Sequence, residues 1–121
     1  LLAIGDAVLP ATGAAEVVDH LIRLVGIDEE TAHLDLAQLG LGDPMALSGR
    51  TAGGAGVLRA RHYHRTRRPV SLADCIAAAL AAELGAPLAS ADPALLDLCA
   101  AESTPFIALA GSDGSRWQRP T

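Results

Sequence analysis

Three carboxylate side chains stand where the sequence predicts the first turn of a helix. Asp74 follows the predicted N-cap Ser71 by three positions, and Asp92 precedes Pro93, a residue typical of a first helical turn. Glu16 lies in the first turn of another predicted helix. A carboxylate in an apolar frame needs hydrogen bonds, a cation or a metal, because removing it from water is costly. We therefore consider these acids as candidate ligands for a divalent cation.

Each acid also has a purely structural explanation. A negative side chain near a helix N-terminus is stabilised by about 0.3–1 kcal/mol through the helix dipole. Taken together, however, the acids occupy positions that are typical of a ligand site. Asp92 comes directly after a predicted strand, and Glu16 opens the helix after another one. Because ligands of parallel sheets sit beyond the carboxyl ends of the strands, we expect the acids to meet at one sheet edge.

The elements that must position these acids alternate between strand and helix. Apolar residues at helical spacing, together with cap residues, predict helices over residues 13–25, 29–39, 72–84 and 93–102. Short apolar runs predict strands over residues 7–11, 87–90 and 105–109. This order predicts an α/β fold with a parallel sheet covered on both faces. The helix over 72–84 is almost entirely apolar and should be buried nearly all round, whereas residues 110–121 should form a mobile polar tail.

A distinctive pattern runs through residues 71–92. It reads Ser-Leu-Ala-Asp, an Ala-rich helix, Glu-Leu-Gly-Ala-Pro-Leu and Ser-Ala-Asp, with a weaker match in Ala-Glu-Val at residues 15–17. In these segments the chain resembles the PIN-domain ribonucleases, which include the toxins of VapBC toxin–antitoxin pairs. The resemblance implies a single three-layer α/β/α domain over residues 1–109, with a further helix over residues 46–64. It also implies that Glu16, Asp74 and Asp92 are metal-binding catalytic acids, with Ser90 orienting one of them from the second shell of the site.

The reaction implied by this resemblance is the hydrolysis of RNA. Cleaving a phosphodiester near neutral pH requires a hydroxide nucleophile and neutralisation of charge on the phosphoryl oxygens. Mg²⁺ or Mn²⁺ held by oxygen ligands supplies both. The resemblance thus implies a metal-dependent endoribonuclease, the toxin of a toxin–antitoxin pair, acting on structured RNA such as tRNA or rRNA. By the same resemblance it would form a homodimer and be inhibited by a small antitoxin protein.

One departure from the family supports a different class of function. The family's first acid lies in an N-terminal strand, in a pattern like Val-Leu-Asp-x-Ser, and no such segment occurs here. A PIN-like module that has lost catalysis and serves in binding or assembly is therefore the alternative. Leu1 to Ile4 look like the helix start that follows this strand in relatives. We accordingly expect the strand and its acid before Leu1, and a further gap near Ile4–Gly5.

The segment from Arg59 to Arg68 holds five of the nine arginines of the chain. It leads directly into the helix that bears Asp74, which favours contacts with RNA phosphates. The residues expected to make them are Arg65, Arg67 and Arg68. A solvated helix face that pairs with the many acids of the chain remains the alternative. His62 and His64, two positions apart on a helix, would point to nearly opposite sides and do not suggest a metal pair.

Composition limits the remaining possibilities. The 121 residues suit one domain, and the net charge of −5 argues against a protein that coats nucleic acid by charge alone. Cys75 and Cys99 lie on predicted buried helix faces and should be free thiols of a reducing compartment. No apolar run reaches the roughly 20 residues of a membrane span, and no signal peptide is visible. We therefore expect a cytoplasmic protein that does not enter a membrane.

Overall fold

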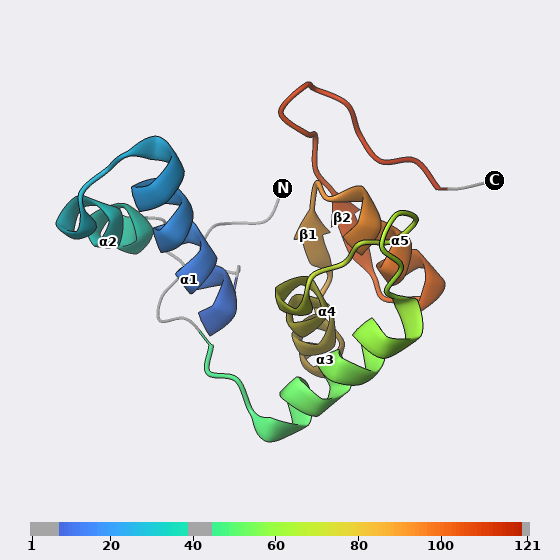
Figure 1. The fold of residues 1–121 in the computed structure, drawn as a ribbon. Helices are drawn as coiled ribbons and strands as arrows, with labels where there is room; N and C mark the ends of the chain where they lie inside the picture. The colour runs from blue at the N-terminus through green and yellow to red at the C-terminus, as the bar shows by residue number, and fades with distance from the viewer. Residues whose placement is uncertain (1–7, 39–44, 120–121) are drawn as a thin grey trace. The chain divides into compact units, whose positions relative to one another are not determined.

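The computed structural model describes residues 8–38 and 45–119 (Figure 1). The chain forms two compact units, residues 1–47 and residues 48–121. Within the described residues there are five α-helices, a π-helical segment and one parallel pair of strands. The α/β class predicted from the sequence is confirmed at this level.

The first unit contains two helices that the apolar spacing predicts. Helix α1 spans Ala11–His20 and continues as a π-helical segment, Leu21–Val25. Gly26 ends it with a φ of 85°, a left-handed conformation that favours glycine. Helix α2 spans Glu29–Gln38, and its first turn is capped because Oδ1 of Asp28 accepts a hydrogen bond from the Thr31 amide at 2.8 Å.

The start of α1 differs from the prediction. The part of the predicted strand over 7–11 that the structure describes forms only an isolated bridge between Pro10 and Met45, and the helix begins at Ala11. Thr12, which the sequence offers as the N-cap of a helix over residues 13–25, therefore lies inside α1. The Met45 carbonyl accepts a hydrogen bond from the Ala11 amide at 2.9 Å, so the first free N–H of the helix has a partner without a capping side chain.

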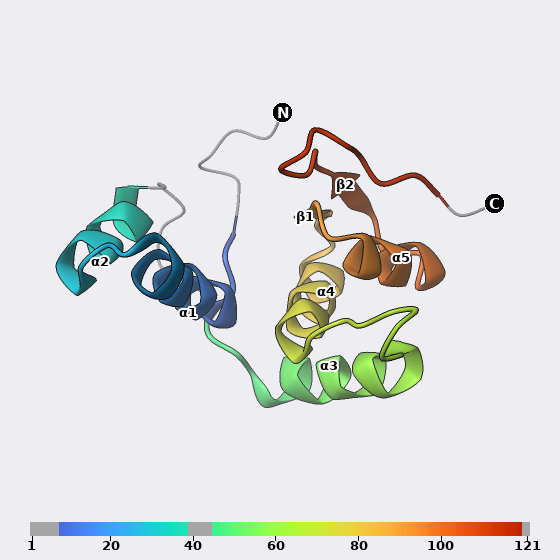
Figure 2. The ribbon, with the colours of Figure 1, turned by 45° about the horizontal axis from the view of Figure 1, so that its top comes forward.

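The second unit is organised around two helices that lie side by side, α3 and α4 (Figure 2). Helix α3 spans Gly49–His62 after the N-cap Ser48, which is shorter at both ends than the predicted 46–64. Helix α4 spans Leu72–Leu84, as predicted, and Gly85 ends it with a φ of 63°. Together these helices bury the small residues that face each other across their contact.

The strands β1 and β2 flank the fifth helix in the sequence. Strand β1 spans Leu88–Ser90, α5 spans Pro93–Ala101 and β2 spans Phe106–Ala108. The two strands pair in parallel, with Leu88 opposite Phe106. They therefore form the β-α-β unit that the alternation of elements predicts, and Asp92 follows the carboxyl end of β1.

The core of the second unit joins α3, α4, β1 and α5. Its largest fully buried side chains are Val70, Cys75, Leu96, Leu98 and Cys99. The expectation that α4 is buried nearly all round is wrong at its ends, because Leu72 is 52% exposed and Leu84 is 45% exposed. The buried residues of α4 all lie in its middle, between Cys75 and Ala81.

The segment after β2 contacts the rest of the second unit, although its polar composition predicts a mobile tail. The indole Nε1 of Trp117 donates a hydrogen bond to Oδ1 of Asp97 on α5 at 2.7 Å. The same ring meets Phe106 edge to face, with centroids 5.1 Å apart. These contacts hold part of the tail against the β-α-β unit. No helix in the described part of the chain is long and apolar enough to cross a membrane.

Candidate functional site

Asp74 and Asp92 each sit at the start of a helix in the second unit, where local hydrogen bonds fix them. Oδ2 of Asp74 accepts from the Ser71 amide at 3.1 Å, while the Ser71 hydroxyl accepts from the Asp74 amide at 3.0 Å. This is the capping box predicted from the sequence. Oδ1 of Asp92 accepts from the Ala94 amide at 3.1 Å and caps α5. Each aspartate keeps its second oxygen outside these capping bonds.

The two aspartates lie next to each other, although they belong to different helices. Partial burial raises the pKa of Asp92, and the Asp74 carboxyl raises it further through its charge and as a hydrogen-bond partner. The hydrogen bond from the Ala94 amide opposes this change in pKa. The neighbouring Asp74 carboxyl disfavours the ionised form of Asp92, so the site at Asp92 favours a proton or a cation.

The described arginines and histidines do not neutralise this pair. Among the ion pairs of residues 8–38 and 45–119, none includes Asp74 or Asp92. Two carboxylates supply the oxygen donors that Mg²⁺ and Mn²⁺ prefer, and these ions need only a few protein ligands beside water. The donor set is therefore suitable for such an ion. No group of three or more metal-binding side chains occurs in the described part of the chain.

Ser90 holds the backbone of Asp92. Its hydroxyl accepts a hydrogen bond from the Asp92 amide at 3.0 Å, at the point where β1 ends. This contact fixes the chain between strand and helix, which determines where the Asp92 carboxylate is presented. The structure thus shows that Ser90 contacts the backbone of Asp92. Its predicted role, to orient an acid of a metal site, remains a prediction.

Glu16 lies in the other unit, on α1. The prediction that it occupies the first turn is wrong, because the helix begins at Ala11 and Glu16 is its sixth residue. Its side chain is exposed. The helix dipole acts mainly within the first turn, so it gives little account of this acid. The convergence of Glu16 with Asp74 and Asp92 remains a prediction.

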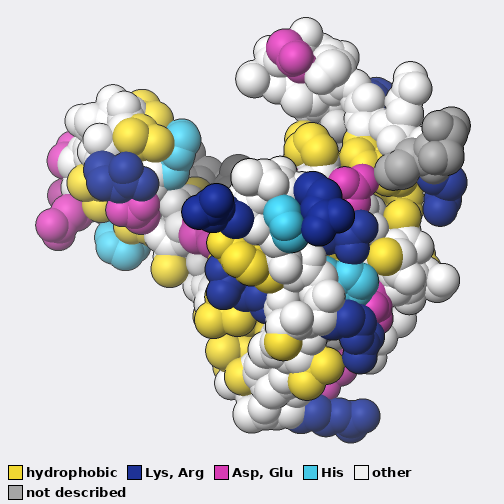
Figure 3. Space-filling view, turned by 45° about the vertical axis from the view of Figure 1, so that its right-hand side comes forward, with side chains coloured by type: hydrophobic (Ala, Val, Ile, Leu, Met, Phe, Trp, Pro, Cys, Tyr) yellow, Lys and Arg dark blue, Asp and Glu magenta, His cyan; other side chains and the backbone are white. Residues whose placement is uncertain are grey.

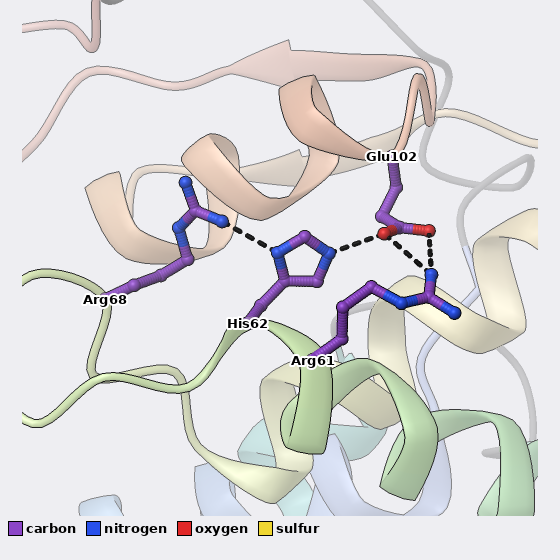
Figure 4. A network of polar contacts seen from close by, with 4 residues as sticks. All are labelled: Arg61, His62, Arg68 and Glu102. Atoms are coloured by element: carbon purple, nitrogen blue, oxygen red, sulfur yellow. Dashed lines mark hydrogen bonds and ion pairs between the residues drawn. The ribbon is translucent and has the colours of Figure 1, made fainter.

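A second polar cluster joins the end of α3 to the end of α5 (Figure 4). Nη1 of Arg61 contacts both carboxylate oxygens of Glu102, at 3.0 and 2.9 Å. Nε2 of His62 lies 2.5 Å from Oε2 of the same carboxylate, and Nη1 of Arg68 lies 2.7 Å from Nδ1 of His62. Hydrogen bonds from His62 and Arg61 lower the pKa of Glu102. We call these four residues the Glu102 cluster.

The Glu102 cluster determines which nitrogen of His62 carries a proton. A guanidinium group only donates, so Arg68 donates to Nδ1, and Nδ1 is unprotonated. Nε2 is then the protonated nitrogen and donates to Glu102. Both ring nitrogens are occupied, which agrees with the view that His62 and His64 do not form a metal pair. Arg68, predicted to contact RNA, has instead a partner within the protein.

The remaining arginines of the segment lie in the loop after α3. The Nδ1 atom of His64 accepts from the amides of Thr66 at 3.2 Å and Arg67 at 3.0 Å, which forms a tight turn. The side chains of Arg65 and Arg67 are exposed and make no hydrogen bond or ion pair within the described residues. In Figure 3, arginine and histidine side chains adjoin one another on the visible face of the second unit. Arg61 thus pairs with an acid, as the alternative interpretation predicts, whereas contacts of Arg65 and Arg67 with RNA phosphates remain a prediction.

The two thiols are structural. Cys75 and Cys99 are free and buried, as predicted. Burial raises the pKa of Cys99 to about 11 and also raises that of Cys75. Both are thus protonated at neutral pH and unsuited to nucleophilic catalysis.

The sequence alone gives no sign of the role of Glu102, because its partners lie about 40 positions earlier and no motif links them. Only the approach of the end of α3 to the end of α5 reveals the cluster. Comparisons of the chain with protein-family models, with curated proteins and with solved structures found no match. The resemblance to PIN-domain ribonucleases accordingly remains a prediction.

Proposed function

We propose that this protein is a metal-dependent endoribonuclease of the PIN-like type, the toxin of a toxin–antitoxin pair. The observation that carries the proposal is that Asp74 lies near enough to Asp92, at the carboxyl end of a parallel strand, to raise the pKa of Asp92. Two carboxyl groups brought together, with no cationic partner among the described residues, form an unfavourable arrangement that a divalent cation would relieve. Capping a helix requires only one acid at each helix start, and it does not require the two acids to touch.

In the proposed site, Asp74 and Asp92 hold Mg²⁺ or Mn²⁺, and Glu16 is the third acid. The bound ion would supply a hydroxide nucleophile and neutralise charge on the scissile phosphate. Ser90 fixes the strand end from which Asp92 projects. Arg65 and Arg67 supply exposed charges for RNA phosphates. The three-layer sheet, the homodimer and the antitoxin belong to the same proposal, since they follow from the family resemblance.

The test measures Mn²⁺ binding by calorimetry and cleavage of total RNA for the full chain. Asp74→Asn and Asp92→Asn should each weaken Mn²⁺ binding and lower cleavage more than about 100-fold, since replacing a ligand should cost more than the 10–100-fold typical of an outer-shell partner. Asp28→Asn is the matched control, because it makes the same change at the cap of α2. Asn is as good an N-cap as Asp, so the helices of Asp28→Asn and Asp92→Asn should persist.

Circular dichroism of each variant shows whether the fold is kept. Unchanged cleavage in a folded Asp74→Asn variant would contradict the mechanism. A wild-type chain that binds neither Mn²⁺ nor Mg²⁺ would favour the alternative, a PIN-like binding or assembly module.

A further inference from the structure

A shallow depression lies on the second unit where α3 ends and α4 begins. Its volume is about 380 Å³, and its lining residues are Gly56, Arg59, Ala60, Tyr63 and Leu72. A Cβ atom added at Gly56 would meet nothing within 4 Å, so the floor is open at that point. Its lining includes no residue of the Glu102 cluster and none of the residues assigned above to the metal.

Arg59 and Tyr63 form a fixed platform inside this depression. They lie four residues apart at the end of α3, the spacing at which helical side chains meet. The Arg59 guanidinium carbon is 4.3 Å from the centroid of the Tyr63 ring, a cation–π contact. Nε of Arg59 also donates to the carbonyl of Val70 at 3.2 Å, and Val70 is fully buried. The guanidinium is therefore anchored at one end to the core.

The charge of Arg59 is not neutralised by any carboxylate that the structure describes. Arg50 and Arg61 lie on the same helix and pair with Glu83 and Glu102, whereas Arg59 takes part in none of the ion pairs of the described residues. A guanidinium has five N–H donors, and the bond to Val70 uses one of them. The terminal amino groups thus remain available for an anion, and their planar fork matches phosphate oxygens.

The rest of the platform is flat and apolar. Tyr63 is 46% exposed and Leu72 is 52% exposed, although side chains of this kind are usually buried. The guanidinium lies over one face of the Tyr63 ring, so a nucleobase would stack on the opposite face. Aromatic rings and guanidinium planes are surfaces on which unpaired nucleobases stack. A group that combines an anion with a flat ring therefore fits this depression better than a simple anion or a simple apolar chain.

We propose that Arg59 and Tyr63 form a nucleotide subsite for single-stranded RNA, in which a base stacks on Tyr63 and an adjacent phosphate binds Arg59. The choice of RNA rests on the proposed nuclease function. Leu72, which borders the subsite, precedes Asp74 by two residues in α4. The subsite and Asp74 therefore lie at the same end of α4, so a single strand bound in the subsite runs past the start of the helix that bears Asp74.

Tyr63 gives a direct signal, because it is the only tyrosine of the chain. The probe is a 12-nucleotide oligoadenylate, added to full-length protein with ¹³C-labelled tyrosine rings in EDTA, so that no metal-dependent hydrolysis occurs. Base stacking should shift the single pair of ring signals upfield. An oligonucleotide of the same length with abasic positions throughout should leave the signals nearly unchanged. Equal shifts with both probes would overturn the stacking assignment.

Affinity measurements separate the ring from the charge. Tyr63→Phe keeps the ring and should bind oligoadenylate within about twofold of wild type, whereas Tyr63→Leu should bind about 5-fold to about 100-fold more weakly. Arg59→Gln should reduce the slope of log K against log salt by about 0.7. Arg50→Gln is the matched control, since Arg50 lies about two and a half turns away on the opposite side of α3.

The outcomes distinguish this subsite from the nuclease proposal. Equal affinities of Tyr63→Leu and wild type, or a wild type that binds no oligoadenylate, overturn the subsite whatever the cleavage assay shows. A weakened Tyr63→Leu together with full cleavage by Asp74→Asn supports the subsite and rejects the metal site.

Discussion

In the second unit, carboxylates at the N-terminal ends of helices differ from a carboxylate at a C-terminal end. Asp74 and Asp92 stand at the starts of α4 and α5, lie near enough for Asp74 to raise the pKa of Asp92, and have no cationic partner among the described residues. Glu102 follows the end of α5 and contacts Arg61 and His62. The pKa of Asp92 is raised, mainly by partial burial, whereas that of Glu102 is lowered by its hydrogen bonds.

This contrast separates a carboxylate that stabilises the fold from one that is suited to a ligand. Glu102 has its charge matched by the protein, so its removal should cost stability. Asp92 sits beside another acid, so ionising it in the absence of a cation works against folding. Carboxylates retained in such an arrangement are typical of functional sites, where stability is exchanged for binding.

The largest expected effect is on the free energy of unfolding, which two isosteric substitutions should change in different directions. Glu102→Gln should lower the free energy of unfolding by about 1 kcal/mol, because it replaces charge-assisted hydrogen bonds with neutral ones. Asp92→Asn keeps the N-cap and removes the like charge, so it should leave stability unchanged or raise it by a few tenths of a kcal/mol, about 0.5 at most. Urea unfolding at pH 7 without divalent cations measures both values.

If Asp92→Asn destabilises the chain as much as Glu102→Gln does, the comparison fails. Asp92 would then be an ordinary cap with no cost of ionisation. Asp28→Asn serves again as the control for the capping change alone.

The pH dependence of stability should differ between the same two variants. Glu102 has a lowered pKa, so its contribution is present above its ordinary value of 4.5 and is lost as the pH falls through the folded-state pKa. Asp92 has a raised pKa, so its contribution is present below 3.8 and is lost as the pH rises through the folded-state pKa. Glu102→Gln should flatten the acid side of the profile, and Asp92→Asn should flatten the loss above 3.8.

Thermal unfolding across pH 2.5–7, an interval chosen to bracket both carboxyl groups at about their ordinary values, measures these profiles. A wild-type profile that neither substitution changes would show that the two environments do not differ in the folded state.

The smallest effect concerns the arginines, which also include residues with and without a partner in the protein. Arg65 and Arg67 have no partner in the described residues, so the double change to Gln should alter stability by less than about 0.5 kcal/mol. It should reduce the salt slope of oligoadenylate binding by up to about 0.7 for each lost phosphate contact. Arg61→Gln should instead affect unfolding, because it removes the ion pair with Glu102. An unchanged salt slope in the double variant would leave Arg65 and Arg67 as solvated charges.

The sequence by itself determined the local structure around the candidate site. Ser71, Asp74 and Gly85 specify the start and end of α4 through contacts between residues close in the chain, and Asp92 with Pro93 specifies the start of α5 in the same way. Such signals act within one helical turn, so they predict helix ends without knowledge of the fold. The sequence does not predict the start of α1 at Ala11, because the Ala11 amide donates to the carbonyl of Met45, about 34 positions away.

Only the tertiary structure decided which charged groups meet. The contact between Asp74 and Asp92 depends on how α4 and α5 pack, and Glu102 reaches Arg61 and His62 because the ends of α3 and α5 adjoin. Residue types gave no preference among these pairings, since any exposed acid could have paired with any of nine arginines. Which carboxylate is neutralised and which stays unmatched is a property of distance in space, and apolar packing between helices sets that distance.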